Sequence, residues 1–263
     1  MDIRSIAVAV DFDETKSDAT RYAIDLARSF NAKLIGVGAH APTMAYGGLD
    51  NGATALEYYT LERTETDARL KRAGEEFRAL VPASVSSEWR AYVADPTQSI
   101  ISVARLADII VAGSRIATGE LVVGAGRPVL AVGEGKSGFA ADRMLIGWKD
   151  TREARRAVAD ALPFLKRAKD VVAVTISEGE PALEKENLDD LLAWLHQHEV
   201  SARAEVLSNK DGHVDMLESA ARAHAADLVV AGAYGHTRMR EWLFGGMTRN
   251  LIEASNITCF FSN

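Results

Sequence analysis

The stretches ADIIVAG at residues 107–113 and ADLVVAG at residues 226–232 decide the fold of this chain. Each has an acidic residue, a short apolar run and a closing glycine, and the two copies differ only by exchange of aliphatic residues. A short apolar run that ends in glycine is typical of a buried strand. The internal repeat therefore predicts two similar halves.

The regions around the repeat also correspond. The strand pattern from Ile6 to Val10 precedes a helical pattern from Ser17 to Phe30, and Met144 to Trp148 precedes Arg152 to Leu165 in the same way. Strand and helix patterns then alternate, at 33–38, 56–80, 86–92 and 96–106 in the first half and at 170–176, 183–198, 201–207 and 214–224 in the second. This alternation predicts βαβ units and a parallel sheet with right-handed crossovers, which is an α/β fold.

The boundary between the halves is predicted in the run GEGKSG at residues 133–138, which separates a closing strand from the next opening strand. We expect two domains, at residues 1–138 and 139–263. The first carries a glycine-containing insert from Ala39 to Ala55, which we interpret as a loop or lid.

Composition restricts the class of function. The formal net charge of −7 disfavours nonspecific binding to nucleic acid or to an anionic membrane, since both need a basic face. The apolar runs are far shorter than the roughly 20 residues that span a bilayer, and Asp11 interrupts the N-terminal run before it reaches signal-peptide length. We therefore expect a cytoplasmic protein. Cys259, the single cysteine, lies in an apolar run and is expected to be a buried, inert thiol.

The residues predicted to carry the function follow the second copy of the repeat. Gly232 and Gly235 are followed, after nine further residues, by the run Gly245-Gly246-Met247-Thr248. Ligands bind outside the carboxyl ends of parallel strands, and glycine lets backbone N–H groups approach phosphate oxygens. A helical pattern from Thr248 to Ala254 adds a helix N-terminus, which favours an anion. These features predict a phosphate-binding loop; the alternative is that the glycines only form turns.

The spacing Gly-x2-Gly-x9-Gly, followed by Ser or Thr, resembles the ATP-binding motif of the universal stress protein family, and residues 226–250 resemble the C-terminal half of its tandem members. The resemblance implies two tandem Rossmann-like domains of the adenine nucleotide alpha hydrolase-like type. Each would have a five-stranded parallel sheet, and the domains would pair through their last strands as an intrachain pseudo-dimer. The family has nucleotide-binding and non-binding branches. Membership of the first implies ATP as ligand, accompanied by Mg²⁺ held chiefly by phosphates and water.

The resemblance also assigns residues to the nucleotide. Ala231 and Gly232 are expected to border the adenosine, Gly235 and Gly245 to approach the phosphates, and Thr248 to offer a hydroxyl group. The candidate cofactor-binding residues are Ala231, Gly232, Gly235, Gly245, Gly246, Met247, Thr248 and Asp150.

Two positions in the second half depart from the family pattern. Gly246 stands where the family has Ser or Thr, which removes one side-chain hydrogen bond to phosphate but keeps the backbone donors. Lys149 stands where the family has an aspartate that contacts the adenosine, and Asp150 is the candidate substitute.

The first half departs from the pattern in the opposite way. Asp11 matches the aspartate of the family, but Ile116 stands in place of the second glycine. Gly126 has the spacing of Gly245, yet Arg127-Pro128 and a strand follow at once, which leaves no room for a helix. We expect a degenerate, structural domain in which Asp11 caps the strand end.

No motif predicts a metal centre or a catalytic group. His196 and His198 are two residues apart, which is not the spacing of a zinc site on a helix, and the P-loop lysine pattern is absent. The favoured function is an ATP-binding stress-response or regulatory protein in which nucleotide occupancy biases conformation or partner choice, without catalysis. One alternative is a non-nucleotide-binding pseudo-dimeric interaction module; another is an enzyme that slowly hydrolyses ATP or transfers its nucleotidyl group. Self-association through the domain edges stays open.

Overall fold

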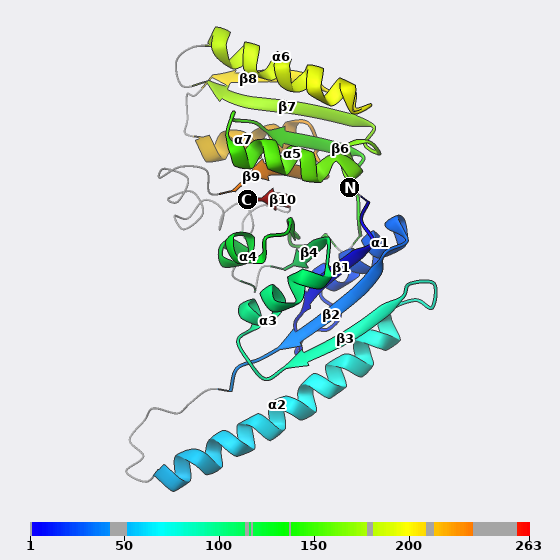
Figure 1. Cartoon of the computed structure of the whole chain (residues 1–263), viewed down its shortest axis with the longest axis vertical. Coiled ribbons are helices and arrows are strands. Elements are labelled where there is room, and N and C mark those ends of the chain that lie inside the picture. The colour runs from blue at the N-terminus through cyan, green and yellow to red at the C-terminus, as the bar shows by residue number, and fades with distance from the viewer. Residues whose placement is uncertain are drawn as a thin grey trace.

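The computed structural model describes residues 2–42, 52–113, 116, 118–136, 138–177, 181–208, 213–233 and 257–263; at 52–55, 181, 208 and 213–215 it describes the backbone alone. These residues form a ten-stranded sheet with the order β3-β2-β1-β4-β5-β10-β9-β6-β7-β8. Figure 1 shows the first half, in blue and green, below the second half, in green to red, with helices along the sheet.

Strands and helices alternate in the first half, as the sequence predicts. All neighbouring strands in this half are parallel, and β1 lies between β2 and β4. The elements are β1 (Ser5–Val10), α1 (Asp18–Phe30), β2 (Lys33–Ala39), α2 (Gly52–Leu80), β3 (Ser87–Tyr92), α3 (Pro96–Val103), the 3-10 helix η1 (Ala104–Leu106), β4 (Ile109–Ala112), α4 (Thr118–Ala125) and β5 (Val129–Ala131).

The second half repeats this strand order, with β6 between β7 and β9 in a parallel arrangement. Its elements are β6 (Arg143–Gly147), α5 (Arg152–Leu165), β7 (Asp170–Ser177), α6 (Pro181–Gln197), β8 (Arg203–Ser208), α7 (His213–Ala223), β9 (Leu228–Gly232) and β10 (Thr258–Ser262). In each half, successive strands are added first to one side of the opening strand and then to the other, so the strand order reverses between β1 and β4 and between β6 and β9. Such a reversal opens a crevice at the carboxyl ends of the strands.

Local capping sets where the helices begin. Ser17 accepts a hydrogen bond from the backbone N–H of Thr20 at the start of α1, and Thr151 accepts one from Ala154 at the start of α5. A hydroxyl group at this position satisfies an N–H group that the helix itself leaves unpaired. Each helix therefore begins a few residues after the first strand of its half, at the carboxyl ends of the strands of that half.

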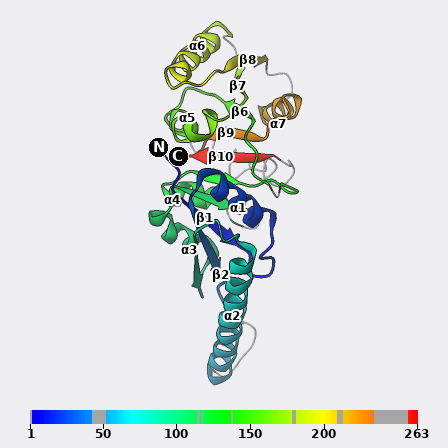
Figure 2. The same cartoon turned by 90° about the vertical axis from the view of Figure 1, so that its right-hand side faces the viewer.

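The two halves meet through their last strands. β5 and β10 pair antiparallel, with Cys259 opposite Ala131 and Phe261 opposite Val129. This confirms the expectation that the closing strands join two five-stranded parallel sheets into one. Figure 2 shows β10 in red at the middle of the molecule, between the two halves. The position of the domain boundary within residues 133–138 stays a prediction.

A hydrophobic core lies on each face of the sheet. One core contains buried side chains from α1, α2, α5 and α6, and the other contains side chains from α3, α4 and α7. Strand residues alternate between the two cores, because successive side chains of a strand point to opposite faces. Within the part of the chain that the structure describes, no helix is long and apolar enough to cross a membrane.

An aromatic cluster covers the junction of the halves. Phe164 of α5 packs edge-on against Phe30 of α1, Phe139 of the connecting segment and Phe260 of β10, with ring centroids 5.2, 6.0 and 5.7 Å apart. Tyr22 of α1 packs against Phe139 at 5.6 Å. The core on this face is thus continuous from one half to the other.

Candidate functional site

The end of β9 is the part of the predicted nucleotide site that the structure describes most fully. Gly147 of β6 pairs with Ala231 of β9, so the carboxyl ends of these strands are level at the point where strand order reverses. Ala231 and Gly232 are half-buried there. The structure thus places both residues at the edge where a ligand of this fold is expected.

Gly232 lies in close contact with the start of α5. A Cβ atom at this position would lie 2.3 Å from the backbone nitrogen of Ala154, which no side chain can achieve without displacing the helix. Gly113 holds the corresponding place in the first half, and there a Cβ atom would lie 3.4 Å from that of Ala19. Close helix packing is therefore one established reason for glycine at 232, in addition to any contact with phosphate.

Asp150 lies at the same edge but points elsewhere. Its carboxylate accepts a hydrogen bond from Nε of Arg155 at 2.7 Å, and both side chains line a cavity between α5 and α6. Neither Ala231 nor Gly232 lines that cavity. Asp150 thus shares an edge of the sheet with the two β9 residues, while its side chain is directed to a different space.

Five of the predicted site residues lie outside the described part of the chain: Gly235, Gly245, Gly246, Met247 and Thr248. Their assignment to the phosphates stays a prediction. Lys149 is described and exposed, in the short connection between β6 and α5.

The equivalent edge of the first half forms a crevice of about 560 Å³. Sequence reasoning placed no binding site here. Residues at the ends of β1, β2 and β4, at the starts of α1 and α3, and in the connecting segment line it: Ala9, Val10, Asp11, Phe12, Glu14, Ser17, Asp18, Ala19, Val37, Ala39, His40, Pro96, Ile100, Gly113, Ile116, Val132, Gly133, Glu134 and Gly135. These elements converge only in the folded chain, so no local sequence pattern marks the crevice.

The charge of this crevice is acidic. Asp11, Glu14, Asp18 and Glu134 line it, and the described lining residues include no lysine or arginine. The backbone N–H of Gly135 donates to a carboxylate oxygen of Asp18 at 2.8 Å, which holds the connecting segment over the start of α1.

Asp11 and Gly126 are the two residues of the first half that match the nucleotide-binding pattern, and local backbone geometry accounts for both. Asp11 accepts a hydrogen bond from the N–H of Asp13 at 2.9 Å, which is a turn after the strand. Gly126 has a φ of +57° directly after α4, as expected for a residue that ends a helix. Helix α4 (Thr118–Ala125) occupies most of the segment between Gly113 and Gly126, where the sequence pattern predicts no helix. β5 follows Gly126 closely, as expected.

The described residues at the two strand edges can be compared with the groups that a metal ion or an anion requires. Among them, no group of three or more histidine, cysteine or acidic residues has the geometry to hold a metal ion. At the edge of β6 and β9, the described N-terminus of α5 lies beside Gly232, and a helix N-terminus favours an anion.

Comparison with known proteins agrees with this architecture. Residues 2–124 match the sequence model of the universal stress protein family. The match lies in the first half, whereas the glycine spacing that resembles this family lies in the second. No curated protein matches the chain.

Solved structures match nearly the whole chain. The chain is similar to a universal stress protein from Archaeoglobus fulgidus DSM 4304, with a TM-score of 0.68, 14% identity and coverage of 98% of this chain and 96% of that one. It is also similar to a protein of unknown function from Pseudomonas aeruginosa PAO1, with a TM-score of 0.57, 13% identity and coverage of 99% and 92%. At such identities the likeness shows the fold, which is that of Rossmann-like universal stress proteins.

Proposed function

We propose that this protein is a regulatory protein of the universal stress protein type, which binds ATP, accompanied by Mg²⁺, in its second half. Its activity is binding, and nucleotide occupancy biases its conformation or its choice of partner. The observation that carries the proposal is the contrast between the two crevice edges: glycine spacing suited to phosphate follows β9, while the edge beside β1 and β4 is lined by four carboxylates.

The second half has the features that an anionic nucleotide requires. Ala231 and Gly232 lie level with the end of β6, where the adenosine would rest. α5 begins beside Gly232, and the N-terminus of a helix favours negative charge. In the proposed complex, backbone N–H groups at Gly235 and Gly245 bind the phosphates, and Gly246, Met247 and the Thr248 hydroxyl complete the loop.

The proposal assigns no catalysed reaction to the protein. Mg²⁺ would arrive with ATP and be held by phosphates and water, since the described residues offer no preformed metal site. No general base is assigned beside the phosphate loop, so ATP would act as a bound effector.

A second candidate is a pseudo-dimeric interaction module that binds no nucleotide. One observation favours it: the packing of Gly232 against Ala154 accounts for that glycine without any ligand. Asp150 also pairs with Arg155 and points into another cavity. The two candidates differ in a single measurable property, which is ATP binding.

Calorimetric titration of ATP and Mg²⁺ into matched variants tests the proposal. Gly245→Val should weaken ATP binding by about tenfold or more, because the β-branched side chain occupies space needed by phosphate and the loss of about 1.4 kcal/mol changes affinity tenfold.

The control is Gly126→Asn in the first half, because asparagine tolerates the positive φ of +57° at this position. Its ATP affinity should equal that of the parent. Parent protein that binds no ATP would favour the interaction module, and loss of binding in the control would place the site in the first half.

A further inference from the structure

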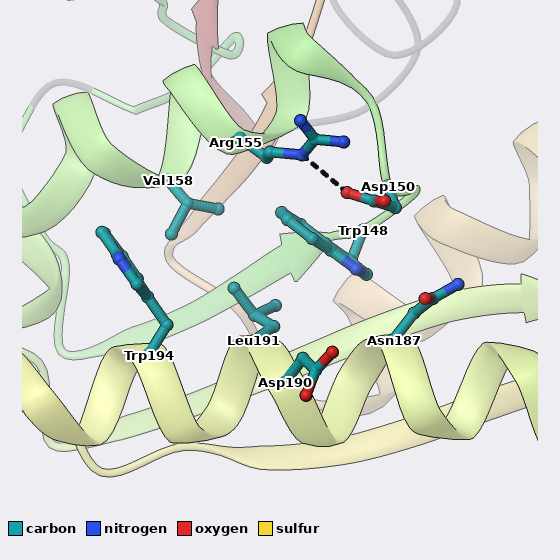
Figure 3. Close-up of a pocket in the computed structure, with 8 residues that line it drawn as sticks. All are labelled: Trp148, Asp150, Arg155, Val158, Asn187, Asp190, Leu191 and Trp194. Carbon is teal, nitrogen blue, oxygen red and sulfur yellow. Dashed lines mark hydrogen bonds and ion pairs between the residues drawn. The ribbon is translucent and has the colours of Figure 1, made fainter.

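A cavity of about 310 Å³ lies between α5 and α6, beside the end of β6. Figure 3 shows its lining: Trp148 and Asp150 from the strand end and the following connection, Arg155 and Val158 from α5, and Asn187, Asp190, Leu191 and Trp194 from α6. The proposed nucleotide edge, with Ala231 and Gly232, is a separate space. The volume is at the lower end of the range for small-molecule sites, roughly 300–1,000 Å³.

Aromatic and aliphatic side chains form the walls. In Figure 3 the indole rings of Trp148 and Trp194 stand on either side of the space, with Val158 above and Leu191 below. Trp148 is only 9% exposed, and its buried indole N–H has no acceptor among the described residues.

The charges around the cavity are acidic on balance. Asp150 is paired with Arg155, which leaves the Asp190 carboxylate as the net charge of the lining. Asp190 is exposed and forms no hydrogen bond or ion pair with the described residues. A ligand that matches the apolar walls and the Asp190 carboxylate should therefore have an apolar body and a positive charge.

The first half holds a cation near the end of its own first strand, at positions that do not correspond one to one with those of the cavity. The connection after β1 carries Phe12 and Asp13, and Arg69 of α2 lies over the Phe12 ring with its guanidinium carbon 4.5 Å from the centroid. Arg69 also pairs with Asp13. An aromatic ring and a carboxylate after β1 thus hold a cation that α2 supplies.

The second half has an aromatic side chain and a carboxylate near the end of β6, and its cation, Arg155 of α5, is paired with Asp150. The connection after β6 carries Trp148 and Asp150, while α6 contributes Asn187, Asp190, Leu191 and Trp194 to the cavity. None of these described α6 residues is basic.

We infer that this cavity binds a small organic cation of the alkylated ammonium type, with the ammonium group against the indole faces and Asp190 as its counter-ion. Tryptophan is the best aromatic partner for a cation, and quaternary ammonium groups are recognised by aromatic side chains in this way. An anionic ligand would meet Asp190, and a bare metal ion would find too few ligand groups, since the described residues contain no metal-binding cluster.

Choline is the probe for this inference, and 3,3-dimethylbutan-1-ol, which has the same shape without the charge, is its matched control. Titration followed by tryptophan fluorescence at low ionic strength should show saturable choline binding. The alcohol should bind about tenfold more weakly, since a desolvated cation–π contact is worth about 1–2 kcal/mol. Equal binding of the two compounds would show a hydrophobic pocket only.

Two neighbouring carboxylates on α6 give a matched pair of variants. Asp190→Asn should weaken choline binding by about fivefold, whereas Asp189→Asn, which changes an exposed residue outside the cavity lining, should leave it unchanged. Trp194→Leu should weaken binding by about tenfold. Equal effects at 189 and 190, or the absence of choline binding in the parent, would overturn the inference. ATP affinity should be the same in all three variants, so failure of the nucleotide proposal would leave this test intact.

Discussion

The acidic residue of the internal repeat has a structural role in both halves. Asp108 accepts hydrogen bonds from the backbone N–H groups of Arg4 and Ser5, each at 2.9 Å, and Asp227 accepts one from Arg143 at 2.9 Å. Asp108 thereby holds the start of β1 beside the start of β4, and Asp227 holds the start of β6 beside the start of β9. The repeat that identifies the fold in the sequence is therefore explained by strand pairing.

Burial controls the chemical reactivity of Cys259. Burial raises the pKa of its thiol to about 12. The folded protein should therefore react with thiol reagents at neutral pH only after unfolding, since the thiolate is the reactive form. Rapid stoichiometric labelling of folded protein would contradict this.

The same shift predicts a pH dependence of stability. The stabilisation from the neutral thiol is fully present below the ordinary pKa of 9.0 and is lost as the pH rises towards about 12, because the unfolded state releases the proton first. Urea unfolding of the parent and of Cys259→Ala over this pH range measures this effect. As the pH rises, the free energy of unfolding should fall less in the variant than in the parent.

At the scale of elements, the contact between β9 and α5 is the tightest helix–strand approach found at the described glycines. We predict that Gly232→Ala lowers the free energy of unfolding by about 3 kcal/mol, at the upper end for overpacking, because the added methyl group would meet helix backbone.

Gly113→Ala is the matched control. Its methyl group would lie 3.4 Å from Ala19, close to ordinary contact, so the expected loss is below about 1 kcal/mol. Denaturant titration of both variants measures the difference, and equal losses would show that the backbone at 232 relaxes without cost.

The sequence predicts most elements because periodicity is a local property. Strands such as β1 and β6 and helices such as α1 and α5 agree with their predicted ranges to within a residue or two.

Helix α4 was missed because residues 113–128 were interpreted through the spacing of a glycine loop. Both cavities were also missed, since they form where residues distant in sequence meet, such as Trp148 with Trp194 or Asp11 with Glu134. Of the predicted nucleotide site, the sequence places Ala231 and Gly232 at the carboxyl end of their strand, because parallel strands end together; their contact with a nucleotide stays a prediction.

At the scale of the whole molecule, the continuous core and the β5–β10 pairing make the halves interdependent. Phe164 is 1% exposed and contacts aromatic rings from both halves. We predict that Phe164→Ala lowers the free energy of unfolding by about 3–5 kcal/mol, the usual cost of such a truncation.

The parent should unfold in a single transition, monitored by circular dichroism and by tryptophan fluorescence, because one aromatic cluster stabilises both halves. Two separate transitions, with only one of them shifted by the substitution, would show that the halves fold independently.

The central claim is that one half binds ATP and the other does not. Native mass spectrometry of the freshly purified chain with ATP and Mg²⁺ tests it most directly, because it counts nucleotides per chain. The account predicts one ATP per chain at saturation, released on denaturation, and a clearly lower ATP occupancy of Gly245→Val at an ATP concentration near the Kd of the parent. Two nucleotides per chain, or none at any concentration, would contradict it.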